Sequence, residues 1–311
     1  MKSAEKYLTI EDLENIPPLG TNYALNSSEV NSAVVSDIIS NISPSSINKY
    51  YDLNSNEFIR QSKKVLLNGD ESENLNIVFF KGIRDSLTYL IKSLRISLVI
   101  FPRNSYPGNL QVCKYAGVDY KTYDGAKDLE ILMEIYDSNE TIIIWEDPGN
   151  PENRGNLSFE KIKKSKIFID CAYRFPSMRK NENIELRRFF KERVYLAFGF
   201  SKSTSIPGSS LSFLLSLEEI NDDLYPIKWN IFQASVAATI IRDEIINLLY
   251  EETYLKSLKI YSELESYYLS RGLKVYSTLN PCFITIDNKN IPTRDLVKLY
   301  KEKDIARVSI K

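Results

Sequence analysis

Short apolar runs separated by amphipathic stretches dominate the chain from about residue 75 to residue 226. Runs of this length that are rich in Ile, Val and Phe are typical of buried strands. They predict strands at Asn76–Phe80, Ser97–Phe101, Thr141–Trp145, Lys166–Ile169, Val194–Phe198 and Leu211–Leu215. Apolar positions at helical spacing predict helices between them, for example at Asp85–Leu94 and Asn109–Tyr115. Strands that alternate with helices predict an α/β fold with a largely parallel sheet.

The two ends of the chain have a different pattern. Residues 1–60 are polar, with short helical patches around Glu11–Glu14 and Glu29–Ile42. Residues 229–271 carry apolar positions at helical spacing with few breakers, which predicts one long helix or two in succession, ended by Gly272. The rest is expected to form two strands, a helix and a last strand, at Leu273–Tyr276, Cys282–Ile286, Thr293 to about Lys301, and Ala306–Ile310.

The charge balance and one missing residue type narrow the chemistry. Lysine and arginine total 40, aspartate and glutamate total 41, and the formal net charge is -1. This balance gives no basic surface for nucleic acid. The chain has no histidine, which excludes Ser-His-Asp and Cys-His catalysis and histidine-ligated metals. Acid–base chemistry must therefore use Lys, Asp, Glu, Tyr or Cys.

The cysteines and the apolar segments indicate a cellular compartment. The three cysteines lie far apart, at Cys113, Cys171 and Cys282. They cannot form a four-cysteine zinc site, and their odd number does not suggest a disulfide framework, so we expect buried free thiols. The N-terminus is acidic where a signal peptide needs an apolar stretch, and the most apolar region, Leu87–Phe101, is interrupted by Lys92 and Arg95. We expect a cytoplasmic protein that does not enter a membrane.

Polar residues follow several of the predicted strands, at the edge where open α/β sheets bind ligands. Asp170 ends the run KIFID, and Lys202 follows the run VYLAFGF. A buried carboxylate is costly without a cation or a donor, and a desolvated lysine can become a Schiff-base nucleophile. Taken alone, however, Asp170 is more often a helix cap or part of a salt bridge, and Lys202 a solvated loop residue.

Other candidates are equally weak one by one. Gly82 precedes a predicted helix whose first N–H groups could hold a phosphate, with Arg84 adding charge. Asn150 lies in a Gly-Asn-Pro segment that reads equally well as a turn, and Arg307 near the C-terminus could be a surface residue. No Rossmann, P-loop or G-x-S-x-G motif is present in the sequence.

Together, in this order and at this spacing, these residues resemble the fold-type I pyridoxal-phosphate (PLP) enzymes. Among those enzymes, the class I/II aminotransferases similar to histidinol-phosphate aminotransferase look closest. The matching segments are Gly82, Asn104-Ser105-Tyr106-Pro107, Asn150-Pro151, Asp170-Cys171-Ala172-Tyr173, Ser201-Lys202 with Pro207-Gly208, and Arg307. The resemblance implies the PLP-dependent transferase (aspartate aminotransferase-like) fold. In that fold we expect a large α/β domain with a mainly parallel sheet at residues 45–228. A smaller α+β domain would combine residues 1–44 and 229–311.

The resemblance also implies a role for each residue around the cofactor ring. Lys202 would form a Schiff base with PLP and then move the Cα proton of the substrate. Asp170 would pair with the pyridine nitrogen and keep it protonated. Tyr173 and Asn150 would hydrogen-bond the phenolic oxygen, and Tyr106 would stack on the ring.

Further residues would hold the phosphate and the substrate. The resemblance assigns the phosphate to the N–H groups of Ile83 and Arg84, beyond Gly82, and to the Ser201 hydroxyl. Arg307 would bind the substrate α-carboxylate as a bidentate pair. The family forms homodimers in which a tyrosine of the second subunit reaches the phosphate, and the candidates for it are Tyr50 and Tyr51.

Two departures from the family pattern weaken the phosphate contacts. The position of the phosphate-binding arginine holds Ser210, and a position that commonly carries a hydroxyl holds Gly199. Arg84 is a candidate replacement for the lost charge. A central-metabolism enzyme would be expected to keep the arginine, so the departures favour a specialised biosynthetic pathway.

The leading hypothesis is a PLP-dependent aminotransferase that acts on an amino acid and 2-oxo acid pair through Lys202, with no metal. An alternative is a PLP-dependent decarboxylase, lyase, cyclase or oxidase of an amino acid at the same site. A second alternative is a degenerate, non-catalytic binding module. The lost phosphate residues favour that module slightly. Five retained residues oppose it more strongly, namely Lys202, Asp170, Tyr173, Asn150 and Arg307.

Overall fold

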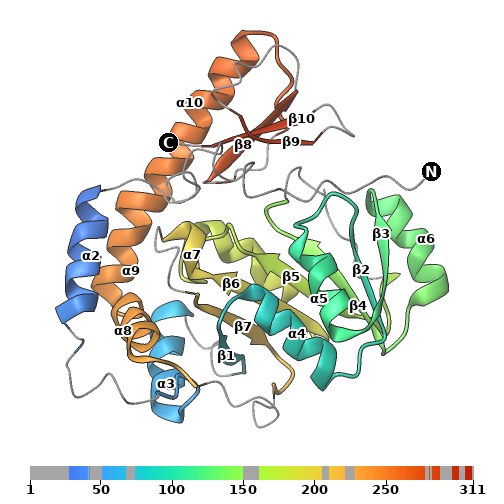
Figure 1. Ribbon diagram of the computed structural model, residues 1–311, viewed down its shortest axis with the longest axis horizontal. Coiled ribbons are helices and arrows are strands. Elements are labelled where there is room, and N and C mark those ends of the chain that lie inside the picture. The colour runs from blue at the N-terminus through green and yellow to red at the C-terminus, as the bar shows by residue number, and fades with distance from the viewer. Residues whose placement is uncertain are drawn as a thin grey trace, which may run out of the picture.

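The computed structural model contains a large twisted sheet covered by helices and a small sheet at one end (Figure 1). It describes residues 28–40, 42, 51–67, 74–149, 161–204, 210–220, 228–276, 280, 282–287, 296–300 and 305–309. Within these residues, no helix is both long and apolar enough to cross a membrane. The three cysteines are buried and free, as predicted.

The large sheet has seven strands in the order β1-β7-β6-β5-β4-β2-β3. Their bounds are β1 Asn76–Phe80, β2 Leu98–Pro102, β3 Asp119–Tyr123, β4 Thr141–Glu146, β5 Lys166–Cys171, β6 Val194–Gly199 and β7 Ser212–Ser216. The pairs β3–β2, β2–β4, β4–β5 and β5–β6 are parallel, and β7 runs antiparallel to both β6 and β1. The predicted largely parallel sheet is confirmed, and β3 is a strand that the apolar runs did not reveal.

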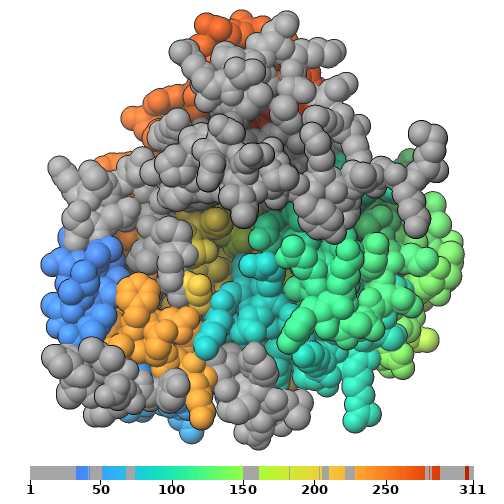
Figure 2. All heavy atoms as spheres, viewed as in Figure 1, coloured from blue at the N-terminus to red at the C-terminus, as the bar shows by residue number. Residues whose placement is uncertain are grey.

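Both faces of the sheet are buried because alternate residues of each strand point to opposite sides. In β1, Ile77 and Phe79 join one apolar cluster, whereas Val78 and Phe80 join another. The second cluster is covered by α4 (Ile83–Ser93) and α5 (Gly108–Ala116). Figure 2 shows these two helices, in cyan and green, side by side on the near face of the molecule. The first cluster contains residues of α3 (Asn56–Leu66), α6 (Ala126–Tyr136) and α8 (Ile231–Ile240).

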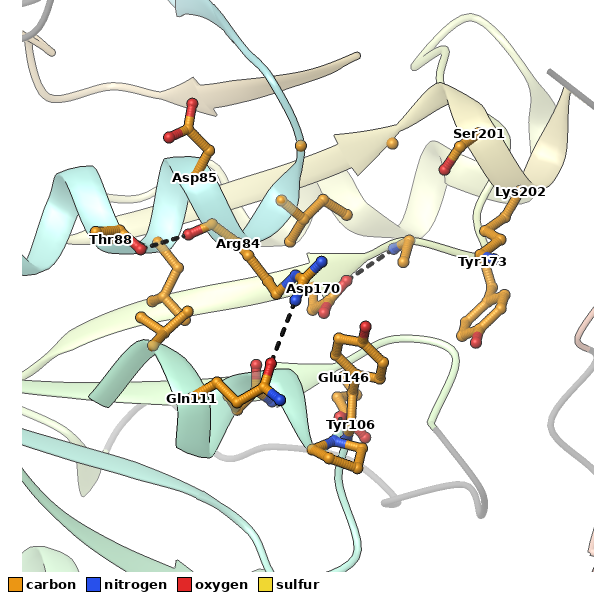
Figure 3. Close-up of a pocket in the computed structure, with 18 of the residues that line it drawn as sticks. Arg84, Asp85, Thr88, Tyr106, Gln111, Glu146, Asp170, Tyr173, Ser201 and Lys202 are labelled. Atoms are coloured by element: carbon orange, nitrogen blue, oxygen red, sulfur yellow. Dashed lines mark hydrogen bonds between the residues drawn. The ribbon is translucent and has the colours of Figure 1, made fainter. Parts of the chain in front are cut away.

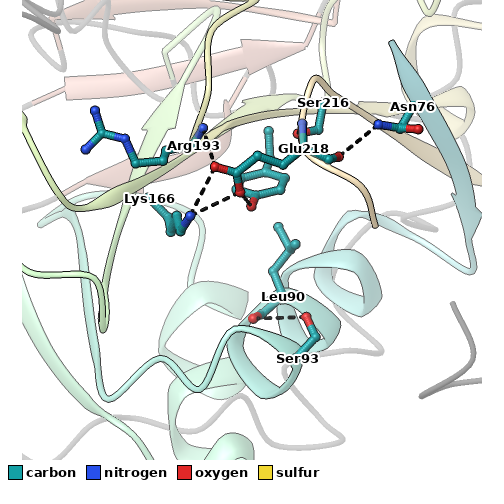
Figure 4. Close-up of polar contacts among 8 residues, drawn as sticks. Asn76, Leu90, Ser93, Lys166, Arg193, Ser216 and Glu218 are labelled. Carbon is teal, nitrogen blue, oxygen red and sulfur yellow. Dashed lines mark hydrogen bonds and ion pairs between the residues drawn. The ribbon is translucent and has the colours of Figure 1, made fainter. Parts of the chain in front are cut away.

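A charged network joins the strands at the edge opposite to the predicted ligand site (Figure 4). Glu218, just after β7, accepts hydrogen bonds from the Lys166 side chain at 3.0 and 3.1 Å and from the Arg193 amide at 2.8 Å. The Tyr195 hydroxyl also donates to it, and Asn76 of β1 donates to its main-chain oxygen at 3.1 Å. Burial opposes the ionisation of Glu218, but these donors in sum lower its pKa. Glu218, just after β7, therefore connects β5 and β6 through its carboxylate and β1 through its main-chain oxygen.

The helices after residue 230 connect the two parts of the molecule. α8 is followed by α9 (Asp243–Leu249), a π-helical turn (Tyr250–Leu255) and α10 (Lys256–Ser270). α8 and α9 pack against α2 (Ser28–Ser40), and α10 contacts the small sheet. The long helical stretch was predicted, and its break falls at Ile241–Arg242. The domain division at residues 45 and 229 stays a prediction.

The small sheet has the order β8-β10-β9, with β8 at Phe283–Asp287, β9 at Leu296–Tyr300 and β10 at Ile305–Ser309. The helix expected from Thr293 to about Lys301 is wrong over β9. There Leu299 pairs with Ala306 across an antiparallel ladder. The segment LVKLY has a helical pattern too short to outweigh the hydrogen bonds that the free edge of β10 offers.

Candidate active site

A cavity of about 900 Å³ lies at the carboxyl ends of the parallel strands. Most of the predicted site residues line it, namely Gly82, Ile83, Arg84, Tyr106, Asp170, Tyr173, Ser201, Lys202 and Arg307. Figure 3 shows Asp170, Glu146 and Tyr106 grouped together, Lys202 and Tyr173 to one side, and Arg84 and Gln111 to the other. The fold therefore brings together residues that are more than 200 positions apart in the sequence.

Three other predicted residues are not among the described residues that line this cavity. Asn150 and Tyr50 lie outside the described residues. Tyr51 is not among the lining residues. Its main chain instead pairs with Trp229, with N–H to oxygen distances of 2.9 and 3.2 Å. The contribution of a tyrosine from a second subunit stays a prediction.

Lys202 lies just beyond the end of β6, in the short helix α7 (Phe200–Ser203). The preceding Phe200 is fully buried, and its amide donates to the Leu211 oxygen at 3.0 Å, which fixes the turn to the core. Burial lowers the pKa of Lys202, and the Arg307 charge lowers it further, whereas Cys282 acts in the opposite direction. A lysine with a lowered pKa has more of the neutral amine, which is the nucleophilic form.

Asp170 faces the cavity from the end of β5. Its carboxylate accepts a hydrogen bond from the Ala172 amide at 2.9 Å, and no ion pair reaches it within the described part of the chain. Burial raises the pKa of Asp170 to about 6, and the Ala172 hydrogen bond acts against this rise. A desolvated carboxylate that opens onto a cavity is suited to bind a cation there.

The small sheet reaches the same cavity through an aromatic contact. Phe283 of β8 packs edge-on against Tyr173, with ring centroids 5.2 Å apart. The Arg307 guanidinium lies 4.6 Å from the centre of the Phe283 ring, and Arg307 is only 5% exposed. One buried aromatic ring thus contacts both Arg307 of the small sheet and Tyr173, which lies two residues after β5 of the large one.

The N-terminus of α4 forms the far wall of the cavity. Gly82 adopts φ 137°, a conformation that residues with a side chain rarely adopt. Asp85 accepts from the Lys81 amide at 3.2 Å. Burial raises the pKa of Asp85, and the interactions with Lys81 act in the opposite direction. The first N–H groups of a helix have no acceptor within it, so this end of α4 is suited to bind an anion.

Arg84 extends from the same turn along the cavity. Its Nη1 donates to the Gln111 oxygen at 3.4 Å, and its guanidinium lies 5.6 Å from the centre of the Tyr106 ring. Gly108 makes this arrangement possible, because a Cβ there would lie 2.3 Å from Tyr106 and 2.7 Å from Arg84. Ser210, which the resemblance aligns with a phosphate-binding arginine, is exposed with φ 44° and also lines the cavity.

The sequence analysis missed two acidic groups next to the site. Glu146 ends β4, is 4% exposed and lines the cavity. Asp147 forms an ion pair with Arg174 at 2.8 Å, and Arg174 also contacts Glu185 at 2.6 Å. The signal for Glu146 was the same as for Asp170, namely an acid that closes a buried apolar strand.

No known family model matches the chain, and no curated protein sequence matches it. Solved structures match it over almost the whole chain. One is the histidinol-phosphate aminotransferase from Sinorhizobium meliloti in complex with pyridoxal-5'-phosphate, with a TM-score of 0.68 and 15% identity over 94% of this chain and 85% of that chain. The histidinol-phosphate aminotransferase from Clostridium acetobutylicum has a TM-score of 0.64 and 19% identity over 93% and 92%.

A further match has another activity. The L-threonine-O-3-phosphate decarboxylase from Porphyromonas gingivalis is similar with a TM-score of 0.63 and 14% identity, over 92% of this chain and 91% of that chain. At these identities the likeness is one of architecture, and it spans both the large sheet and the small one. The chain therefore has the fold of the PLP-dependent aminotransferases.

Proposed function

We propose that this protein is a PLP-dependent aminotransferase that acts on an amino acid and 2-oxo acid pair through a Schiff base on Lys202. The observation that carries the proposal is that two desolvated ionisable side chains, Lys202 and Asp170, line the same cavity. Burial lowers the pKa of the Lys202 amine and raises that of the Asp170 carboxyl to about 6. A neutral lysine amine can form a Schiff base with the aldehyde of PLP, and the carboxylate can pair with its protonated pyridine nitrogen.

The remaining cavity residues fit the other parts of PLP. Tyr106 would stack on the ring, and Tyr173 would hydrogen-bond the phenolic oxygen, together with Asn150 from outside the described residues. The N–H groups of Ile83 and Arg84 at the start of α4, with the Ser201 hydroxyl, would hold the phosphate. A cavity of about 900 Å³ is in the size range of cofactor sites.

The chain's own residues have defined tasks in this proposal. PLP, when bound, supplies an electron sink for the substrate carbon. Lys202 would remove the Cα proton and return it as general base and acid. Arg307 would hold the substrate α-carboxylate, and its buried position over Phe283 limits the directions from which a substrate can bind. We further propose a homodimer in the cytoplasm that serves a specialised biosynthetic pathway.

The second candidate is another PLP reaction of an amino acid, such as decarboxylation. It is favoured by the likeness to a decarboxylase with a TM-score of 0.63, against 0.64 to 0.68 for the two aminotransferases. Both candidates need the same groups, Lys202 and Asp170, and differ in which bond to Cα is broken. The degenerate binding module would have no reason to keep both groups desolvated.

Product analysis distinguishes these candidates. The PLP-loaded protein is mixed with single amino acids, and the cofactor is extracted and separated by chromatography. A transaminase converts PLP to pyridoxamine phosphate and regenerates PLP when a 2-oxo acid is added. A decarboxylase releases carbon dioxide and leaves PLP unchanged. Lys202→Ala is the matched control, and it is expected to abolish either reaction. Absence of any reaction with all amino acids, in a protein that holds PLP, would favour the binding module.

A further inference from the structure

Glu146 is a buried acid at the site to which the proposed function gives no role. It is 4% exposed, at the last position of a strand buried along its whole length. Its register partner on the neighbouring strand is Asp170, and both residues line the cavity. Placing two acids side by side in a desolvated region is costly, so the position of Glu146 needs a compensating contact.

That contact is made with the loop that carries Tyr106. The Glu146 Oε1 atom accepts a hydrogen bond from the Tyr106 amide at 3.2 Å. The Tyr106 carbonyl oxygen in turn accepts from the Asn109 amide at 2.9 Å. The main chain of Tyr106 is thus held from both sides, although its side chain is 45% exposed. Without the carboxylate, the Tyr106 main chain would lose its hydrogen bond to the end of β4.

We infer that Glu146 is a positioning residue: by holding the Tyr106 main chain, it fixes the position of the Tyr106 ring in the cavity. This inference rests on the proposed function, in which Tyr106 stacks on the cofactor. A stacking partner contributes binding energy only if its ring is held at the right distance, and a hydrogen bond to its own main chain is a direct way to hold it. The acceptor must reach across from β4 to the loop after β2, which the length of a glutamate side chain allows.

A competing explanation is electrostatic. In it, the negative charge of Glu146 would assist Asp170 in attracting the cationic ring nitrogen, and the contact with Tyr106 would be incidental. Two substitutions separate the explanations because they divide the properties of the side chain. Glu146→Gln keeps the length and an accepting oxygen but removes the charge. Glu146→Asp keeps the charge but is one methylene shorter, which withdraws the acceptor from the Tyr106 amide.

The experiment measures the Kd of PLP for each variant by fluorescence titration, together with circular dichroism in the absorption band of the bound cofactor. Positioning predicts that Glu146→Gln stays within about twofold of the wild type and that Glu146→Asp binds about tenfold more weakly. It also predicts an altered dichroism signal only for Glu146→Asp. Combined with Tyr106→Ala, the Glu146→Asp substitution should have almost no further effect, because its partner's ring is gone.

The opposite pattern would overturn the inference. If Glu146→Gln weakens binding and Glu146→Asp does not, the charge is the important property. A full effect of Glu146→Asp in the Tyr106→Ala background would also contradict positioning through Tyr106. Failure of the proposed function is recognised separately, because the wild type would then bind no PLP, and the inference would fall with it.

Discussion

The Cys282 thiol, just before β8 of the small sheet, lies 3.7 Å from the main-chain oxygen of Lys202, which follows β6 of the large sheet. The two residues are 80 positions apart, and the contact brings the start of β8 against the turn that carries the lysine. Asn280 supports this geometry by accepting from the Cys282 amide at 2.9 Å. The small sheet thus packs against the Lys202 turn itself and forms one wall of its surroundings.

This burial predicts an unreactive thiol. Burial raises the pKa of Cys282 to about 12, although the Lys202 and Arg307 charges lower it. The thiolate is therefore scarce at neutral pH, and the other two cysteines are buried as well. We expect Ellman's reagent to label no cysteine within minutes in the native protein and all three in urea. Rapid labelling of Cys282 in the folded protein would contradict the packing described above.

The desolvated Asp170 predicts that the cofactor-free protein loses stability as pH rises. The folded-state pKa of about 6 lies above the ordinary value of 3.8. Between these values the folded state binds more protons than the unfolded state, so the free energy of unfolding falls as pH rises from about 4 to 6. A shift of this size corresponds to roughly 2–3 kcal/mol.

Urea unfolding of the PLP-free protein at several pH values checks this effect. Asp170→Asn is expected to remove the pH dependence between about pH 4 and 6 and to be more stable than the wild type at pH 7. The same variant should bind PLP more weakly, since the pyridine nitrogen loses its ionic partner. Equal stability of the two proteins over the whole pH range would show that Asp170 is well solvated.

Several parts of this arrangement could be predicted from the sequence because they depend on local patterns. Continuous runs such as TIIIW and VYLAF can be buried only as central strands, and the turns after them lie at the ligand-binding edge. β3 could not be found in this way. Its sequence, DYKTY, is polar because it is an edge strand with three exposed residues in succession.

Other parts depend on contacts between distant segments. β9 is a strand because of its pairing with β10, which no pattern within residues 293–301 reveals. Glu146 gave the same signal as Asp170, yet its partner is an amide 40 positions away in the sequence. The place of Phe283 between Tyr173 and Arg307 likewise depends on how the two sheets meet.

Arg84 is predicted to supply a cationic side chain for the cofactor phosphate. No lysine or arginine lies between Lys202 and Lys228, so the loop after α7 cannot provide one. Among the described residues, Arg84 forms no ion pair and donates only a long hydrogen bond to the neutral Gln111 side chain. We expect Arg84→Gln to weaken the binding of PLP about tenfold and to leave that of pyridoxal, which lacks the phosphate, unchanged.

Lys81→Gln is the matched control for this comparison. Lys81 also lines the cavity, but it is next to the Asp85 carboxylate, which reduces its attraction for an anion. Its substitution should change the Kd of PLP by less than about threefold. Equal losses for PLP and pyridoxal in Arg84→Gln would indicate that the arginine affects the ring and not the phosphate.

Glu218→Gln is predicted to affect stability alone. The substitution removes the charge that Lys166 and two further donors surround, and it should cost about 1–2 kcal/mol of unfolding free energy at pH 7. The pKa of Glu218 is lowered from its ordinary value of 4.5, so this contribution is present at neutral pH and is lost as pH falls below that value. Urea unfolding at pH 7 and at pH 3 measures it. A changed Kd of PLP would contradict the separation of this edge of the sheet from the site.

The most direct test of the account is to trap the lysine. The protein is incubated with PLP, reduced with borohydride, digested and analysed by mass spectrometry. The account predicts one stoichiometric phosphopyridoxyl group on Lys202, and none at any site in a folded Lys202→Ala variant. Labelling spread over exposed lysines, or none on Lys202 at saturating PLP, would contradict the assignment of this cavity as a PLP site.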